Sequence, residues 1–233
     1  MTRCLLWLLL LCGCQELLGR PADLGPAPDL PTDAWGLALV RGQTCVLAEL
    51  RDHRLCSPNH PHGPVTVGLA GGSPSTTTVQ GHFTLELPPG PPLVLLRATD
   101  PRRQLKDALV QLVRNGPPTA LPMVPVERLE LLRALGLPLD PSRGALLAYV
   151  VDAEGRPMRG ARVQVVTQDG RFQGPFFEDG LEVLQRGQQT GPGGLVALFE
   201  LLPGSVTLHL SGARQASYTL AVAADAVTFS LLR

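Results

Sequence analysis

The densest group of potentially reactive side chains lies in the stretch CVLAELRDHRLCSPNHPH. It contains Cys45, His53, Cys56, His60 and His62. Thiolate and imidazole groups are the ligands that zinc and copper prefer, so a metal site is one hypothesis for this stretch. The cysteine spacing is not C-x-x-C, however, and two cysteines this close more often form a disulfide in an oxidising compartment. We therefore expect a disulfide between Cys45 and Cys56, with metal binding as the alternative.

A second candidate stretch, FQGPFFEDGLEV at residues 172–183, combines aromatic rings with carboxylates. Phe172, Phe176 and Phe177 are half of the six phenylalanines in the chain, and Glu178 and Asp179 follow them directly. An aromatic-rich loop between strands is a common place for a ligand or partner to bind. The same rings could instead cap one end of the hydrophobic core, and the sequence leaves both interpretations open.

Composition and motifs argue against catalysis and against nucleic-acid binding. The chain has no G-x-S-x-G, no H-E-x-x-H, no Walker loop and no G-x-G-x-x-G that precedes a helix. Acidic and basic residues number 20 each and form no basic block. That balance removes the electrostatic basis for nucleic-acid binding. We therefore predict that the protein is not an enzyme and uses no cofactor.

The amino terminus has the pattern of an export signal. Met1 and Arg3 give it a positive start, and an apolar run from Cys4 to Leu11 follows. A helix needs about 20 apolar residues to cross the hydrocarbon core of a membrane, so this run is too short to span one.

The run ends in Leu11-Cys12-Gly13-Cys14, which resembles the lipobox of bacterial lipoproteins. The resemblance implies a signal peptide at residues 1–13, cleavage after Gly13, a diacylglyceryl group on the thiol of Cys14, and an acyl chain such as palmitate on its new amine. Two or three acyl chains anchor a protein durably in a membrane. Gln15 follows the cysteine, which in enteric lipoproteins favours the outer membrane, on its periplasmic or surface face. The alternative is an ordinary cleaved signal with incidental cysteines.

Residues 14–34 are rich in proline and show no sustained hydrophobic period. Such segments favour extended conformations of about 3.1 Å per residue, so we expect a tether between the anchor and the folded part. A leading arm that docks through Leu24 and Leu30 is the alternative.

Beyond the tether the sequence repeats a pattern of short strands. The chain has 25 glycines and 23 prolines, which predicts many turns. In TVQGHFTLELPPG (78–90) and TGPGGLVALFELLPG (190–204), threonine and glycine precede an apolar strand and a Pro-Gly turn follows it. Two copies of one strand order predict two similar domains in tandem.

The second copy carries a family resemblance. VVDAEGRPMRGARVQV (150–165), TGPGGL (190–195) and LPG (202–204) resemble the carboxypeptidase regulatory-like domain. The resemblance implies a transthyretin-like, Ig-like Greek-key β-sandwich, a non-catalytic module that recurs in envelope proteins as a spacer, stalk or binding domain. The first copy matches only in its later half. We expect an all-β fold of two tandem β-sandwich domains, at residues 35–124 and 144–233.

A short helix should link the two copies across residues 125–143. Pro125 suits helix entry, and Glu127 suits the positive end of the helix dipole. Leu129, Leu132 and Leu135 fall on one face, and Gly136 can close the helix.

Taken together, these features predict a lipid-anchored cell-envelope protein that acts as a non-catalytic structural or binding module, either an accessory subunit or an adhesion-like protein. Its expected partners are the membrane, through the lipid on Cys14, and an envelope protein or glycan. The alternative is a metal-binding envelope lipoprotein that uses Cys45, His53, Cys56, His60 and His62.

Overall fold

Apolar residues that alternate along short segments, with glycine and proline at the turns between them, form strands along most of the described chain. The computed structural model describes residues 38–233 except 48, 51, 58–62, 115–118, 135, 138, 181–183 and 213–214. The predicted signal peptide, Cys14 and the tether lie outside these residues. The all-β prediction is confirmed.

The first half of the described chain contains a short 3-10 helix, η2, and eight strands. Their bounds are β1 (Ala38–Leu47), η2 (His53–Leu55), β2 (Cys56–Ser57), β3 (Thr66–Leu69), β4 (Gly72–Thr77), β5 (His82–Leu87), β6 (Leu93–Thr99), β7 (Asp107–Val113) and β8 (Thr119–Met123). Helix α1 (Val126–Ala134) follows. The second half comprises β9 (Gly144–Val150), β10 (Arg162–Thr167), β11 (Gln173–Glu178), β12 (Leu184–Arg186), β13 (Leu195–Leu201), β14 (Gly204–Ser211), β15 (Ala216–Val222) and β16 (Ala226–Leu232).

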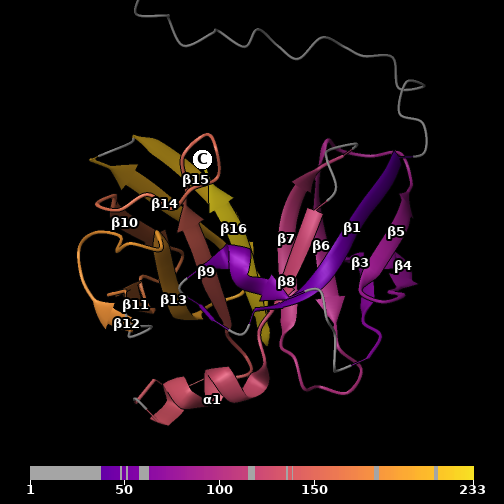
Figure 1. Cartoon of the computed structure of the whole chain (residues 1–233), viewed down its shortest axis with the longest axis horizontal. Helices are drawn as coiled ribbons and strands as arrows, with labels where there is room; N and C mark the ends of the chain where they lie inside the picture. Colours follow the sequence, from indigo (N-terminus) through magenta and orange to yellow (C-terminus); the bar gives the residue numbers. More distant parts are fainter. Residues whose placement is uncertain are drawn as a thin grey trace, which may run out of the picture. The chain divides into compact units, whose positions relative to one another are not determined.

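One continuous sheet runs through both halves, in the order β12-β11-β13-β9-β16-β7-β6-β3-β4. Its centre is β16, which pairs in parallel with β9 on one side and with β7 on the other (Figure 1). Val227 of β16 is the partner of Ala145 on β9 and of Ala108 on β7. Main-chain hydrogen bonds therefore join the two halves, an arrangement that the repeat did not predict.

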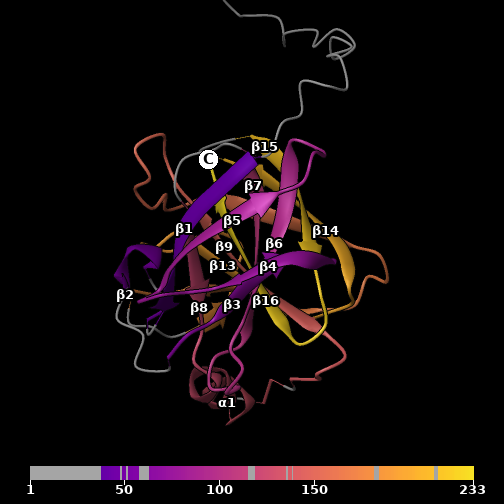
Figure 2. The same cartoon turned by 90° about the vertical axis from the view of Figure 1, so that its right-hand side faces the viewer.

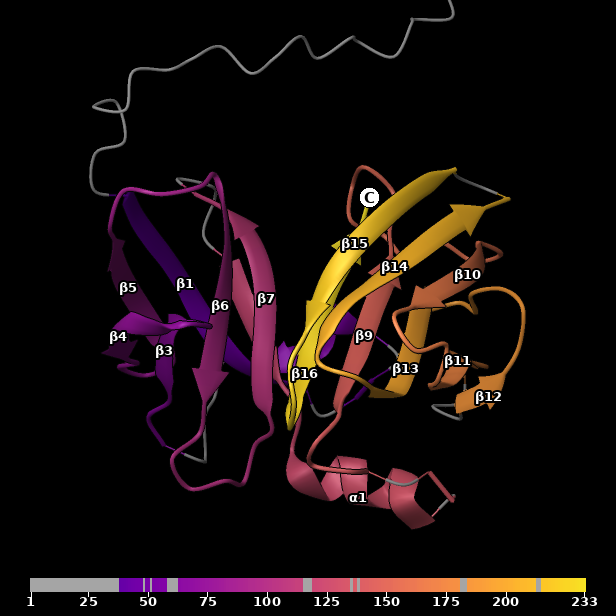
Figure 3. The same ribbon diagram turned by 180° about the vertical axis from the view of Figure 1, so that it is seen from behind.

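Two smaller sheets pack on opposite faces of this large sheet. Side chains alternate between faces along a strand, and on β9 Leu147 and Tyr149 belong to one hydrophobic core, whereas Leu146 and Ala148 belong to another. The first core also contains buried residues of β1, β5 and β8 (Figure 2, with β1 and β5 toward the viewer). The second contains those of β14 and β15 (Figure 3). Every residue of β9 is buried because both of its faces are covered.

The two halves share their strand pairing. β1 pairs in parallel with β8, the last strand of the first half, as β9 does with β16. In the first half, Thr78 Oγ1 accepts a hydrogen bond from the Val65 amide at 3.0 Å, and the Thr78 amide donates to the Val65 carbonyl at 2.8 Å. In the second half, Thr190 makes the same pair of bonds with Ala161, at 3.0 and 2.9 Å. The repeated threonines thus occupy equivalent positions.

Helix α1 confirms the predicted helix between the halves. Leu129 is buried in the first core, while Leu135 and the side chain of Leu132 lie outside the described part. Residues 37–233 form one compact unit. The domain boundaries at residues 124 and 144 remain predictions.

Candidate functional site

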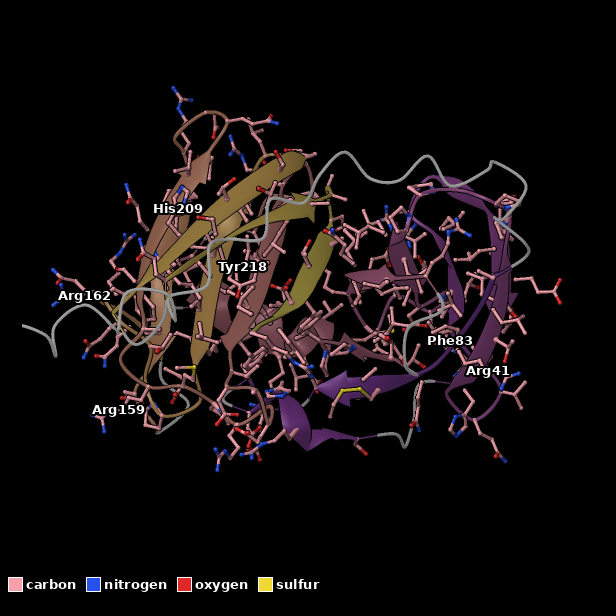
Figure 4. All side chains as sticks on the ribbon, turned by 90° about the horizontal axis from the view of Figure 1, so that it is seen from above. Arg41, Phe83, Arg159, Arg162, His209 and Tyr218 are labelled. Carbon is pink, nitrogen blue, oxygen red and sulfur yellow. A yellow bond between two sulfur atoms is a disulfide. The ribbon has the colours of Figure 1, made fainter. Side chains whose placement is uncertain are left out.

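The Cys45–Cys56 disulfide is present, as predicted, and its two Cα atoms are 5.3 Å apart. It closes the loop between β1 and β2, which pair antiparallel with Leu47 opposite Cys56. The bond is visible in yellow beside the strands of the first half in Figure 4. The disulfide therefore fixes the loop that carries η2.

The disulfide removes both cysteines from the proposed set of metal ligands. Its two sulfurs are bonded to each other and are not available as thiolate ligands. His60 and His62 lie outside the described residues, so of the predicted histidine ligands only His53 can be placed. Within the described ranges, no group of three or more His, Cys, Asp or Glu side chains is arranged to hold a metal ion.

A local hydrogen-bond cluster shapes the loop inside the disulfide. Asp52 caps η2 by accepting a hydrogen bond from the Arg54 amide at 2.9 Å. The Arg54 guanidinium also binds this carboxylate, with Nη2 2.7 Å from Oδ2. Hydrogen bonding from Arg54 lowers the pKa of Asp52 below its usual value. The cap holds His53, the next residue, toward the interior.

His53 packs against Tyr149 of β9, and their ring centroids are 5.1 Å apart. The Tyr149 hydroxyl donates a hydrogen bond to the Leu50 carbonyl at 2.8 Å, and burial raises the pKa of Tyr149. Burial also lowers the pKa of His53. The buried Nδ1 of His53 has no hydrogen-bond partner among the described residues, because Asp52 Oδ1 is 4.0 Å away.

His53 and Tyr149 line a groove of about 500 Å³ between β7, β8 and β16. Val110 and Leu112 of β7 and Leu231 of β16 contribute apolar surface, and Arg233 contributes a cation. The arrangement can enclose an apolar molecule and offer it an imidazole and a positive charge. It is the candidate functional site.

For the aromatic stretch at residues 172–183, the structure agrees with the alternative in which the rings belong to the hydrophobic core. Residues 173–178 form β11, where Phe176 and Phe177 are 7% and 3% exposed. Phe176 belongs to the first core and Phe177 to the second, and Phe172 packs against the second, partly buried. Gly174 and Pro175 lie at an irregularity between Gln173 and Phe176 where β11 pairs with β13. The rings of Phe176 and Phe177 therefore fill the two cores, and partner binding by this stretch remains a prediction.

Sequence reasoning found His53 but missed the rest of the groove. Its walls come from segments around residues 110, 120, 149 and 230, which no motif connects. The parallel pairings of β16 with β7 and with β9 bring the segments around 110, 149 and 230 together, and parallel pairing of distant strands has no local sequence signature. In the described part of the chain, no helix is long and apolar enough to span a membrane.

No protein-family model matches the chain, and no curated protein matches it. Among solved structures, the chain is similar to the TIE protein of Bacillus anthracis, a double mutant of the shaft pilin SpaA of Lactobacillus rhamnosus GG, and GBS52, the minor pilin of Streptococcus agalactiae. The TM-score is 0.28 for each, and the sequence identities are 12%, 12% and 11%. Each match covers 84% of this chain and, respectively, 34%, 97% and 94% of the other. The chain thus spans about a third of the TIE protein. Similarity this weak carries no functional argument.

Proposed function

We propose that this protein is exported, anchored by lipid on Cys14, and acts in the bacterial cell envelope as a non-catalytic structural or binding module. The observation that carries the proposal is the Cys45–Cys56 disulfide, because disulfides form and persist in oxidising compartments such as the periplasm or cell surface. It agrees with the lipobox-like Leu11-Cys12-Gly13-Cys14, which supplies the proposed anchor.

The architecture supports a structural role. Two halves that share the parallel pairings β1–β8 and β9–β16 are joined by the parallel pairing of β7 with β16. A module built in this way can hold a binding surface at a fixed orientation. The proline-rich residues 14–34 would set its distance from the outer membrane, and an envelope protein or glycan would be its partner.

Intact mass of the full chain, expressed in a bacterium that processes lipoproteins and extracted from its membranes, tests the anchor. We expect a mature chain that begins at Cys14 and carries the mass of a diacylglyceryl group and an acyl chain. Cys14→Ser should abolish lipidation and release the protein from the membrane. Cys12→Ser is the matched control and should leave both unchanged. An unacylated wild-type chain, or one that begins elsewhere, would overturn the proposed anchor.

Crosslinking in whole cells tests the module. A structural or binding module should be recovered with an envelope protein or glycan from cells that carry the wild-type chain. Recovery as a monomer alone, after lipidation has been verified by mass, would contradict the binding role while leaving the anchor intact.

A further inference from the structure

The groove between β7, β8 and β16 has the size of a small-molecule site. Its volume of about 500 Å³ lies within the range of roughly 300–1,000 Å³ that is usual for ligand pockets. Its walls are largely apolar, and two of the apolar side chains that line it are exposed to solvent. Val113 and Leu231 line it and are 57% and 44% exposed.

The charged side chain that lines the groove is positive. Arg233 is the one formally charged side chain among the described residues that line the groove, and no described lining residue carries a side-chain carboxylate. Burial is the main cause of the lowered pKa of His53, the carboxylate of Asp52 opposes it, and the charges of Arg54 and Arg233 add to it, so Arg233 lies close to this imidazole. The groove therefore complements an anion.

His53 lies beside the groove and contains a buried nitrogen without a hydrogen-bond partner among the described residues. Buried polar atoms in proteins nearly always have a hydrogen-bond partner, and within the described chain Nδ1 of His53 has none. Its lowered pKa keeps the imidazole neutral at neutral pH, so the ring can either donate or accept a hydrogen bond. Nδ1 is itself buried and lies 4.0 Å from Asp52 Oδ1, so a molecule in the groove would contact the ring of His53 rather than this atom.

We propose that this groove binds a small amphipathic monocarboxylate. The apolar tail lies between Val110, Leu112 and Leu231, and the carboxylate lies at Arg233. A charge-assisted pair of this kind is stronger than a neutral hydrogen bond, particularly where apolar walls exclude water. The site belongs to residues 38–233 and does not depend on the proposed lipid anchor.

Calorimetric titration with decanoate, below its micelle-forming concentration, tests the proposal on the full chain carrying Cys14→Ser, which cannot be lipidated. Decan-1-ol is the uncharged probe of the same length. Leu231→Trp fills the groove, and Leu112→Trp does so from β7 if the first variant fails to fold. Arg233→Gln removes the charge, and Arg159→Gln is its matched control at an exposed position outside the groove (Figure 4).

We expect one decanoate per chain, binding lost in the tryptophan variant, and affinity lowered about tenfold by Arg233→Gln but unchanged by Arg159→Gln. Binding of decan-1-ol should be weaker and insensitive to Arg233→Gln. No binding, binding that the tryptophan variant retains, or equal affinity for acid and alcohol would overturn the proposal. Sedimentation of the same samples tests whether a second copy of the chain occupies the groove. A dimer that dissociates on addition of decanoate, or in the Leu231→Trp variant, would assign the groove to self-association instead.

Discussion

The ring of His53 packs against the ring of Tyr149, with centroids 5.1 Å apart, and so joins the disulfide loop of the first half to a strand of the second. Tyr149 lies in β9 and is 1% exposed, and its hydroxyl reaches the Leu50 carbonyl in the same loop. The loop closed by the disulfide is therefore packed against both halves, and it forms one side of the groove.

Tyr149→Phe should destabilise the protein by about 1 kcal/mol, because it removes one hydrogen bond to Leu50 and retains the ring. Tyr149→Ala should cost about 3–5 kcal/mol, since it also leaves a large cavity in the first core. Val79→Ala, at a position that is 74% exposed, is the control. Urea unfolding measures all three, and equal losses in the two tyrosine variants would show that the ring contact contributes nothing.

The partly buried His53 should make stability depend on pH below about 6.5. Its pKa is lowered in the folded protein, so the unfolded chain binds more protons as the pH falls past the ordinary value of 6.5. The contribution of His53 is therefore complete above pH 6.5 and is lost progressively as the pH falls toward its folded pKa. His53→Phe keeps a ring against Tyr149 and should flatten this part of the profile, measured as urea midpoints from pH 8 to 5.

Asp52 acts in a separate, more acidic window. Its pKa is lowered by hydrogen bonding from Arg54, so its contribution is present above its ordinary pKa of 3.8 and is lost as the pH falls below that value. An unchanged slope between pH 6.5 and 5 in His53→Phe would therefore count against the assignment to the imidazole, because Asp52 does not titrate there.

Removing the disulfide by the double substitution Cys45→Ala, Cys56→Ala should lower the free energy of unfolding by about 2–3 kcal/mol, as expected for a loop of this length. The loop that carries His53 should also loosen. Reduction of the wild-type protein should reproduce both effects, and hydrogen exchange of the loop amides reports the second. A stability that dithiothreitol leaves unchanged would contradict this role.

The sequence allowed the strand pattern, the disulfide and the linking helix to be predicted because each depends on neighbouring residues. Turn residues, two nearby cysteines and helix-end residues are local signals. The β7–β16 pairing was not predictable in this way, since it depends on how two distant strand edges fit. The sequence also left the role of Phe176 and Phe177 open, because consecutive buried rings need a sheet covered on both faces, and that covering is a property of the assembled fold.

Lys106, the only lysine in the chain, precedes β7 and forms an ion pair with Asp225, which precedes β16. The two side chains are 26% and 54% exposed, so Lys106→Met should cost less than about 1 kcal/mol. Asp225→Asn should cost a similar amount, and the double variant no more than either alone. Thermal unfolding should stay a single transition in all three variants, because main-chain hydrogen bonds rather than this ion pair hold β7 against β16. Two separate transitions in Lys106→Met would reverse that conclusion.

The paired threonines offer the sharpest test of the repeat. Thr190 is 1% exposed, accepts a hydrogen bond from the Ala161 amide and donates one to the Met158 carbonyl at 2.7 Å. Thr190→Val keeps the shape but leaves a buried amide without a partner, which should cost about 2 kcal/mol. Thr78→Val should cost a similar amount, because Thr78 holds Val65 in the same way. Thr219→Val, in a hydroxyl pair on an exposed strand face, is the matched control and should change stability by less than about 0.5 kcal/mol. If only one of the two substitutions lowers the free energy of unfolding, the halves share a strand order, but the threonine hydrogen bond does not stabilise both of them.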